Sequence, residues 1–232
     1  VATSDTPNVT FSPTMGCKQS TLRSTGVFMN SQQPSECLYD ISDGSLMFGY
    51  EHRPPSGVNT LRLMNSSVET TTMPCIMRLH SSITKVIVDK SCRTCTRMHM
   101  GFLEDSEGLQ SVDLTGLSNC TAVGWSFLKG CSALKSVDIS PLSKCTSVGS
   151  DFLRGCKALK SVNFKGLSNC TAIHRYFLWE CSSLRSVDMT GFSNCTDVGY
   201  GFASCCTALR QVFVVDGTEL AAILSRLTKY ET

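Results

Sequence analysis

Hydrophobic residues recur in the central part of this chain at a constant step of 25 residues. In the repeated unit, one position is always leucine, one is always phenylalanine and two are always cysteine. A period of this length is typical of a solenoid, in which each coil stacks only on its neighbours. The four series are Leu109, Leu134, Leu159, Leu184 and Leu209; Phe127, Phe152, Phe177 and Phe202; Cys120, Cys145, Cys170 and Cys195; and Cys131, Cys156, Cys181 and Cys206.

Each unit begins with an alternation of apolar and polar residues. Val137 and Ile139 alternate with Ser136 and Asp138, which is the period of a strand with one buried face. Strands of successive units are expected to pair in parallel, because each is followed by a crossover of roughly 20 residues. The later segment SDFLRGC is long enough for a short α or 3-10 turn. The pattern therefore predicts an α/β solenoid with a parallel sheet on one face and short helices or 3-10 turns on the other.

The repeat also sets the expected domain boundaries. It begins faintly at residue 58, where Val58, Leu61 and Leu63 are echoed 25 residues later. One extra residue precedes Leu109, after which the units keep the 25-residue step. We therefore expect a solenoid over residues 58–213, with degenerate repeats over 58–108 and clean repeats over 109–208.

Both ends of this solenoid are expected to be capped, because an open end exposes the core and a sheet edge. Residues 1–57 have no clear period and contain short apolar runs between turn residues. They predict an N-terminal lead-in and an irregular cap of degenerate coils, with a separate small domain as the alternative.

A different signal marks the C-terminal segment, residues 214–232. Asp216 and Glu219 have the spacing of a capping box. An apolar stripe at helical steps follows and predicts a capping helix of about three turns. The alternative, an amphipathic membrane or partner helix, lacks a strongly basic face. The stripe consists of Leu220, Ile223, Leu224 and Leu227.

The stretch LKSVDISPLSKCTSVGSDFLRGCKAL, from Leu134 to Leu159, resembles BspA-like leucine-rich repeats. Those repeats carry Pro or Ser after the strand, then T-x-I-G, then A-F-x-x-C-x-x-L. The resemblance covers about residues 83–213 and implies a leucine-rich repeat solenoid with a protein-binding or surface-adhesion role. This version is similar to members from protists. It departs from the pattern in its 25-residue unit, in Phe-Leu or Phe-Ala for Ala-Phe, and in the extra column at Cys120. The cysteine columns are also similar to those of F-box repeat proteins, but the chain contains no F-box sequence.

Cysteine is unusually frequent, with 14 residues. Cys95 and the eight columnar cysteines fall at core-facing repeat positions. Stacked residues of neighbouring parallel coils lie about 4.8 Å apart, whereas a disulfide prefers Cβ atoms about 3.8 Å apart. We therefore expect ladders of reduced thiols at these positions. The candidates for disulfides are the cysteines outside the ladders: Cys17, Cys37, Cys75, Cys92 and Cys205.

The charge balance excludes some classes of partner. The formal net charge is +2, so the chain lacks the basic excess of a nucleic-acid-binding protein. No run of about 18 apolar residues is present, which predicts no transmembrane segment. Because the chain opens with Val1, the sequence leaves open whether a leader preceded it.

The sequence contains no recognisable catalytic or metal-binding constellation. Its four histidines are scattered, and Cys92-x-x-Cys95 has no second pair to complete a zinc site. Phosphate loops and nucleophile motifs are absent as well. We therefore predict that the protein is not an enzyme and holds no cofactor and no metal.

Binding residues are instead sought on the outer face of the sheet, where polar columns are aligned between coils. The aspartates of one column are expected to repel each other. Either they pair with the neighbouring column of Lys135, Lys160, Arg185 and Arg210 or with serine hydroxyls, or they form an acidic stripe for a basic partner or a cation. The candidate residues are Ser111, Asp113, Ser136, Asp138, Ser161, Asn163, Lys165, Ser186 and Asp188.

A second candidate surface lies on the opposite side of the coils. Trp125, Tyr176, Trp179 and Tyr200 occupy positions where sister units carry small or charged residues. Large aromatic residues of this kind are frequent hot spots of interfaces. The alternative is simple packing at the edge of the coils.

Five N-x-[ST] sequons, at Asn8, Asn65, Asn119, Asn169 and Asn194, complete the pattern. They predict N-glycans if the protein is secreted, or asparagines that hydrogen-bond within turns. Two function classes therefore remain. One is a secreted or cell-surface binding module, such as an adhesin or antigen. The other is an intracellular scaffold or assembly component with reduced cysteine ladders. Extracellular and cytoplasmic locations both remain open, and the partner protein is not identified.

Overall fold

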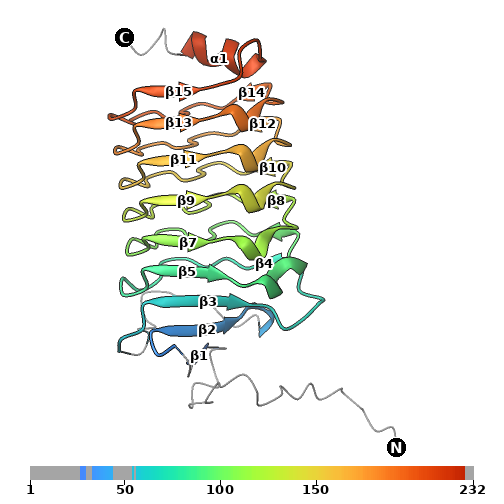
Figure 1. The fold of residues 1–232 in the computed structure, drawn as a ribbon, viewed down its shortest axis with the longest axis vertical. Coiled ribbons are helices and arrows are strands. Elements are labelled where there is room, and N and C mark those ends of the chain that lie inside the picture. The colour runs from blue at the N-terminus through green and yellow to red at the C-terminus, as the bar shows by residue number, and fades with distance from the viewer. Residues whose placement is uncertain (1–26, 30–32, 44–53, 55, 228–232) are drawn as a thin grey trace, which may run out of the picture.

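The computed structural model describes residues 27–29, 33–43, 54 and 56–227. Successive turns of the chain, here called coils, are stacked along one axis from the N-terminal to the C-terminal end (Figure 1). This stack confirms the α/β solenoid that the 25-residue period predicts. Asn8 and Cys17 lie outside the described residues.

The main ladder runs the length of the stack. Except for the first strand, its strands pair in parallel and in register, so that Val162 lies between Val137 and Val187. Pairing is assigned in two sheets, β1-β2-β3-β5-β7 and β15-β13-β11-β9, and β7 and β9 lie side by side between them (Figure 1). The strands are β1 (Val27–Met29), β2 (Glu36–Asp40), β3 (Thr60–Met64), β5 (Lys85–Val88), β7 (Ser111–Asp113), β9 (Ser136–Asp138), β11 (Ser161–Asn163), β13 (Ser186–Asp188) and β15 (Gln211–Phe213).

A second ladder of two-residue strands runs beside the first. Most of these strands come from the C-T-x-[VI]-G part of the unit. They pair in parallel with equivalent strands of neighbouring coils in two sheets, β4-β6-β8-β10 and β12-β14. They are β4 (Thr72–Met73), β6 (Arg97–Met98), β8 (Ala122–Val123), β10 (Ser147–Val148), β12 (Ala172–Ile173) and β14 (Asp197–Val198). The sequence analysis did not predict this ladder.

The 3-10 helices follow the strands of the main ladder directly. In contrast, the segment SDFLRGC forms no helix, so the expected helical turn at this place is wrong. Its residues Asp151 and Leu153 have φ angles of 61° and 57°, and a left-handed residue interrupts a right-handed helix. The 3-10 helices span Ile41–Asp43, Lys90–Thr94, Thr115–Leu117, Ser140–Leu142, Lys165–Leu167 and Thr190–Phe192.

A column of phenylalanine rings fills the centre of the coils. Phe127 and Phe152 stack with ring centroids 4.7 Å apart, and Phe152 and Phe177 stack at 5.0 Å. Phe102 extends the column at one end and Phe202 at the other. The phenylalanines of the 25-residue series therefore form one stacked column, which aligns the coils as well as burying apolar area.

The cysteine ladders are confirmed as free, buried thiols. Each thiol donates a hydrogen bond to a backbone carbonyl, in most cases of the preceding coil. Cys145 Sγ lies 3.2 Å from the carbonyl of Cys120, and Cys156 Sγ lies 3.2 Å from that of Leu128. A buried thiol thus behaves as a small apolar group with one weak donor.

The described cysteines outside the ladders, proposed as disulfide candidates, are free as well. Cys37 and Cys92 are buried, and their thiols donate to the carbonyls of Thr60 and Leu63. Cys75 is partly exposed and Cys205 exposed. The disulfide expectation is therefore wrong for these four, because the coils place their side chains in separate environments.

At the N-terminal end, β1 pairs antiparallel with β2 and covers the edge of the main ladder. β2 itself pairs in parallel with β3, so this part of the segment 1–57 forms a further coil.

The C-terminal end carries α1 (Glu219–Leu227), the only α-helix among the described residues. Its Leu220 is buried and Leu224 packs against the core. The first turn is capped by Thr218, whose Oγ1 accepts a hydrogen bond from the amide of Ala221 at 3.2 Å. The predicted capping box of Asp216 and Glu219 is therefore wrong by two residues. No helix in the described part of the chain has the length and apolar character needed to span a membrane.

Candidate functional site

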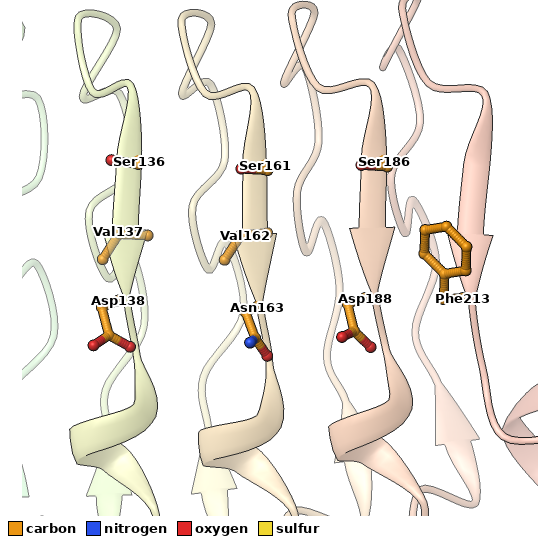
Figure 2. A pocket seen from close by; sticks show the side chains of 9 residues that line it. All are labelled: Ser136, Val137, Asp138, Ser161, Val162, Asn163, Ser186, Asp188 and Phe213. Atoms are coloured by element: carbon orange, nitrogen blue, oxygen red, sulfur yellow. The ribbon is translucent and has the colours of Figure 1, made fainter.

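The outer face of the main ladder carries a shallow groove of about 400 Å³ across β9, β11, β13 and β15. Figure 2 shows its serine, aspartate and asparagine side chains in two rows, with Phe213 closing the C-terminal end. Parallel pairing without a register shift produces these rows, since Ser161 lies between Ser136 and Ser186. The lining residues are Ser136, Val137, Asp138, Ser161, Val162, Asn163, Ser186, Asp188 and Phe213.

Most of the sheet-face candidates named from the sequence are thus brought together in one groove. Ser111 and Asp113 continue the same rows on β7, outside the groove lining. Lys165 lies in the following 3-10 helix. Phe213 was missed by the sequence reasoning. It interrupts the polar column of Asp138, Asn163 and Asp188 in the last coil, and this break was the available signal.

The aspartate column has a structural role that the sequence analysis did not consider. Asp113 and Asp138 Oδ1 each accept a hydrogen bond of 2.9 Å from the amide two residues later. Asn163 makes the same contact at 2.9 Å and Asp188 at 3.0 Å. These bonds form Asx turns that start the 3-10 helices. Within the described chain none of these carboxylates forms an ion pair, so the expected pairing with the lysine and arginine column is wrong.

Asp188 is the best-supported negative charge of the groove. The Thr190 hydroxyl donates to its Oδ1 at 2.5 Å and the Thr190 amide at 3.0 Å. The hydrogen bond from the Thr190 hydroxyl is the largest influence on the Asp188 carboxyl, and it lowers the pKa of this group. The Thr190 amide and the charge of Lys165 lower it as well. Hydrogen bonds to the charged form have this effect. Asp188 is therefore ionised at neutral pH.

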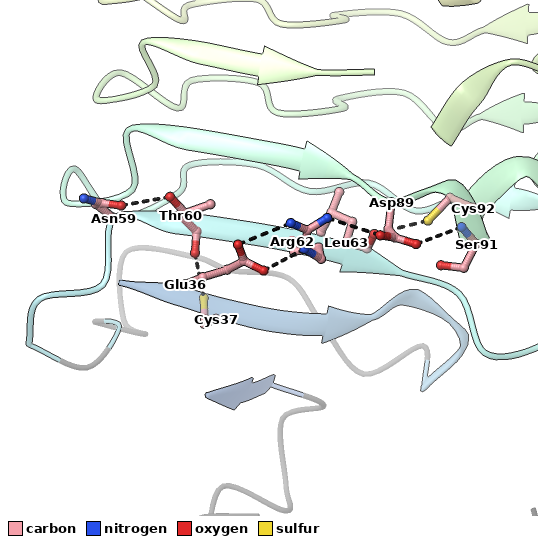
Figure 3. Close-up of polar contacts among 9 residues, drawn as sticks. All are labelled: Glu36, Cys37, Asn59, Thr60, Arg62, Leu63, Asp89, Ser91 and Cys92. Carbon is pink, nitrogen blue, oxygen red and sulfur yellow. Dashed lines mark hydrogen bonds and ion pairs between the residues drawn. The ribbon is translucent and has the colours of Figure 1, made fainter. Parts of the chain in front are cut away.

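The N-terminal part of the same sheet face is occupied by an ion-pair cluster that the sequence analysis missed. Arg62 Nε lies 2.6 Å from Glu36 Oε1, and Arg62 Nη1 lies 3.2 Å from Asp89 Oδ2 (Figure 3). The hydrogen bond from Arg62 to Glu36 raises the pKa of the guanidinium. These charges satisfy each other, so this end of the sheet face lacks free polar columns of the kind found in the groove. The available signal was that Arg62 occupies, two coils earlier, the strand position of Asp113, so that a cation stands where the later coils carry acidic or amide side chains.

On the opposite side, three of the four predicted aromatic residues form one cluster. Tyr176 lies edge-on to Trp179 at 5.2 Å and to Tyr200 at 5.8 Å. The Arg154 guanidinium lies 5.0 Å from the Tyr176 ring centre. We call these four residues the aromatic patch. Tyr200 is 71% exposed, so the patch combines an exposed ring with partly buried supporting rings.

Trp125 is separate from the aromatic patch. It is 64% exposed, and its ring lies against the backbone of the next coil at Gly149, where a Cβ atom would come within 2.4 Å of Trp125 Cδ1. The structure therefore places Trp125 as a single exposed ring next to a glycine that makes room for it.

The sequon asparagines of the repeats are hydrogen-bonded, but to the preceding coil rather than within a turn. The Nδ2 groups of Asn119, Asn169 and Asn194 donate to carbonyls of the preceding coil at 2.9, 2.8 and 3.0 Å. Asn65 is buried and donates to Thr70 O and Thr94 Oγ1. These contacts account for the asparagines without sugars, and the glycans stay a prediction.

Among the described residues, no group of three or more histidine, cysteine or acidic side chains is arranged to hold a metal ion. The described histidines His80, His99 and His174 lie on separate coils. The predicted absence of catalysis is not tested by this observation.

Comparison with known proteins gives one family. The family model of the BspA type leucine-rich repeat region matches residues 78–220 in six copies. A search of curated proteins finds no match. Among solved structures, a leucine-rich repeat protein from Bacteroides ovatus is similar over 75% of this chain and 76% of its own, with 11% identity and a TM-score of 0.22.

Proposed function

The chain belongs to the BspA type leucine-rich repeat family, and from this premise we propose that it is a non-enzymatic module that binds a protein through its sheet face. The observation that carries the proposal is the groove across β9, β11, β13 and β15. A surface-exposed array of serine hydroxyls and carboxylates offers hydrogen bonds at a regular spacing of about 4.8 Å. A partner segment with basic and hydrogen-bonding side chains fits such an array.

The charge of the aspartate column is tested separately from its structural role. Asn163 caps its 3-10 helix with the same amide contact as the aspartates, so an asparagine keeps the turn and removes the charge. We expect the triple variant Asp113→Asn, Asp138→Asn and Asp188→Asn to fold like the wild type and to lose most of its partner binding. Pull-down from an extract of the source cells, followed by titration of the captured protein, measures the loss.

Lys157→Glu is the matched control, because Lys157 is exposed in a turn outside the groove. Retained binding in the triple aspartate variant, with binding lost in the control, would contradict a role for the sheet-face charges.

The aromatic patch and Trp125 are proposed as a second contact surface. Exposed aromatic rings supported by neighbouring side chains are frequent hot spots. Trp125→Ala and Tyr200→Ala are expected to weaken the partner without changing the thermal unfolding midpoint, because both side chains are largely exposed. A variant that unfolds at a clearly lower temperature would assign its aromatic residue to packing instead.

Within this function we favour a secreted or cell-surface module, in the manner of an adhesin or antigen, by the resemblance to surface proteins of this type. The alternative is an intracellular assembly component, and the free state of all thirteen described cysteines supports it. Two measurements on the native protein separate the two. A mass that falls on glycosidase treatment favours the surface protein, and fourteen titratable thiols after unfolding favour the intracellular one.

A further inference from the structure

The last coil ends in a strand edge that nothing in the described chain covers. At the opposite end of the molecule, β1 pairs with β2 and closes the ladder. At this end, α1 lies toward β14, and β15 is the outermost strand (Figure 1). Val212, Phe213 and Val215 are 37%, 51% and 43% exposed, whereas Val187, equivalent to Val212 in the preceding coil, is fully buried. The C-terminal helix therefore closes the core beside β14 and leaves β15 open.

The open edge has none of the features that usually prevent strand pairing. Charged residues, proline and bulges on an edge strand block association. The segment from Gln211 to Val215 reads QVFVV and contains no charge and no proline. Its residues have high β-propensity. Such an edge is suited to pair with another strand.

The hydrogen-bonding groups of β15 define how a second strand can attach. The Gln211 amide donates toward β13, to the Arg185 carbonyl at 3.3 Å. The Phe213 carbonyl accepts from Met189 at 2.8 Å, on the same side. Successive residues of a strand direct their amide and carbonyl groups to opposite edges. The amide and carbonyl of Val212, and the amide of Val214 directly after β15, therefore point to the open edge.

The charged residues on either side of β15 indicate which kind of strand can pair with its open edge. Arg210 lies three residues before Phe213 and Asp216 lies three residues after it. If two copies of β15 pair antiparallel about Phe213, each Arg210, directly before the strand, lies on the side of the Asp216 of the other copy, in the turn that follows the strand. Val212 and Val214 then exchange their outward-facing hydrogen bonds, which is the pattern of an antiparallel pair. Both flanking side chains are exposed, and neither forms an ion pair within the described residues.

We propose that two copies of this chain associate end to end through their β15 strands, antiparallel and centred on Phe213. The two-fold arrangement uses the same patch on both copies, as in most homodimers. It joins the two main ladders at one antiparallel junction and places the exposed Phe213 rings beside each other. The aspartate columns and the groove of each copy remain accessible on the sheet face.

The oligomeric state of the full chain tests this arrangement. A short edge buries less area than a standard interface, so we expect a dimer with a dissociation constant of about 10 µM to 1 mM. Sedimentation equilibrium over that range should show the wild-type mass doubling. Arg210→Asp and Asp216→Arg should each raise the dissociation constant about tenfold or more, because each replaces two attractive pairs by two repulsive ones. The double variant should restore the wild-type constant.

Arg185→Asp is the matched control, because Arg185 occupies the position of Arg210 in the preceding coil and is also exposed. It should leave the dimer unchanged. A wild type that stays monomeric over this whole concentration range would overturn the proposal, even if another segment of the chain were found to cover the edge of β15. A dimer that withstands both single charge reversals would overturn it too, since it would form elsewhere.

Cross-linking tests the register directly. At the two-fold centre, the Cα atoms of the two Phe213 residues would lie about 4.5 Å apart, within the range of disulfides. In a Cys205→Ser background, which removes the exposed native thiol, Phe213→Cys should form a cross-linked dimer on mild oxidation. Val215→Cys is comparably exposed but would face Gln211, so it should not. Equal cross-linking of the two variants would exclude this register.

Discussion

Individual residues of this protein are constrained mainly by their copies in neighbouring coils. Phe152 contacts Phe127 on one side and Phe177 on the other, and all three rings are fully buried. The same holds for the thiols, since Cys170 donates to the carbonyl of Cys145, and Cys145 to that of Cys120. A substitution in a column therefore affects two interfaces between coils.

Truncation of a central ring should be costly. We expect Phe152→Ala to lower the free energy of unfolding by about 3–5 kcal/mol, because it leaves a cavity between two stacked rings. Urea unfolding followed by circular dichroism measures this change. Phe202→Ala is the comparison, since Phe202 is only partly buried and has one ring neighbour in the column. Its cost should be clearly smaller, and equal costs would contradict the column as the source of the effect.

The buried thiols predict a loss of stability in alkali. Burial raises the pKa of Cys156 and that of Cys170 from 9.0 to about 12. Above pH 9 the unfolded chain releases thiol protons that the folded chain still holds. Stability from these groups is therefore complete below pH 9 and is lost as the pH rises toward 12.

The expected result is a thermal unfolding midpoint that falls steadily above pH 9 under reducing conditions. Cys156→Ala should make that fall less steep, because one group with a raised pKa is removed. A slope identical to that of the wild type would show that Cys156 does not titrate differently in the folded and unfolded chain.

At the scale of elements, the sequence predicts what repeats and fails where a local geometry decides. The parallel main ladder followed from the alternation of residues such as Val137 and Ile139, because burial of one face imposes that period. The conformation of the SDFLRGC segment could not be predicted, because Asp151 and Leu153 adopt left-handed conformations that their residue types do not indicate. The groove was predictable as aligned columns. Phe213 was visible as a break in the polar column, but the pattern alone did not show that its ring lines the end of the groove.

The start of α1 is a similar case, in which two capping residues were available and the less obvious one is used. Thr218 caps the helix through Oγ1. We expect Thr218→Ala to destabilise α1 by about 1 kcal/mol and so to speed hydrogen exchange of its amides about fivefold. Exchange monitored by mass spectrometry on the peptide that contains α1 is the measurement. Glu219→Gln is the control and should have a smaller effect. The reverse ranking would reinstate the capping box.

At the scale of the whole molecule, stability is distributed along the stack rather than gathered around one centre. Each coil contacts only its neighbours, so the coil at each end depends on its cap. The two ends differ in this respect. β1 covers one end of the main ladder, whereas β15 is open at the other. This asymmetry leaves an exposed apolar strand at the C-terminal end of the stack, with Val212, Phe213 and Val215 partly open to solvent.

A linear stack also predicts that the molecule tolerates the loss of a complete period. Deletion of residues 134–158 removes one 25-residue unit and joins Leu159 to the position of Leu134. Because β7 and β11 then become neighbours with the same register of inward residues, the shortened chain should fold and unfold cooperatively. Its free energy of unfolding should be lower by about the contribution of one coil and of one interface between coils. Deletion of residues 134–156 shifts the register by two positions and places the wrong residues opposite the phenylalanine and cysteine columns. Circular dichroism and urea unfolding should show a folded protein for the first deletion and a severely destabilised one for the second. If both deletions unfolded the chain alike, the coils would have to depend on contacts far along the rod.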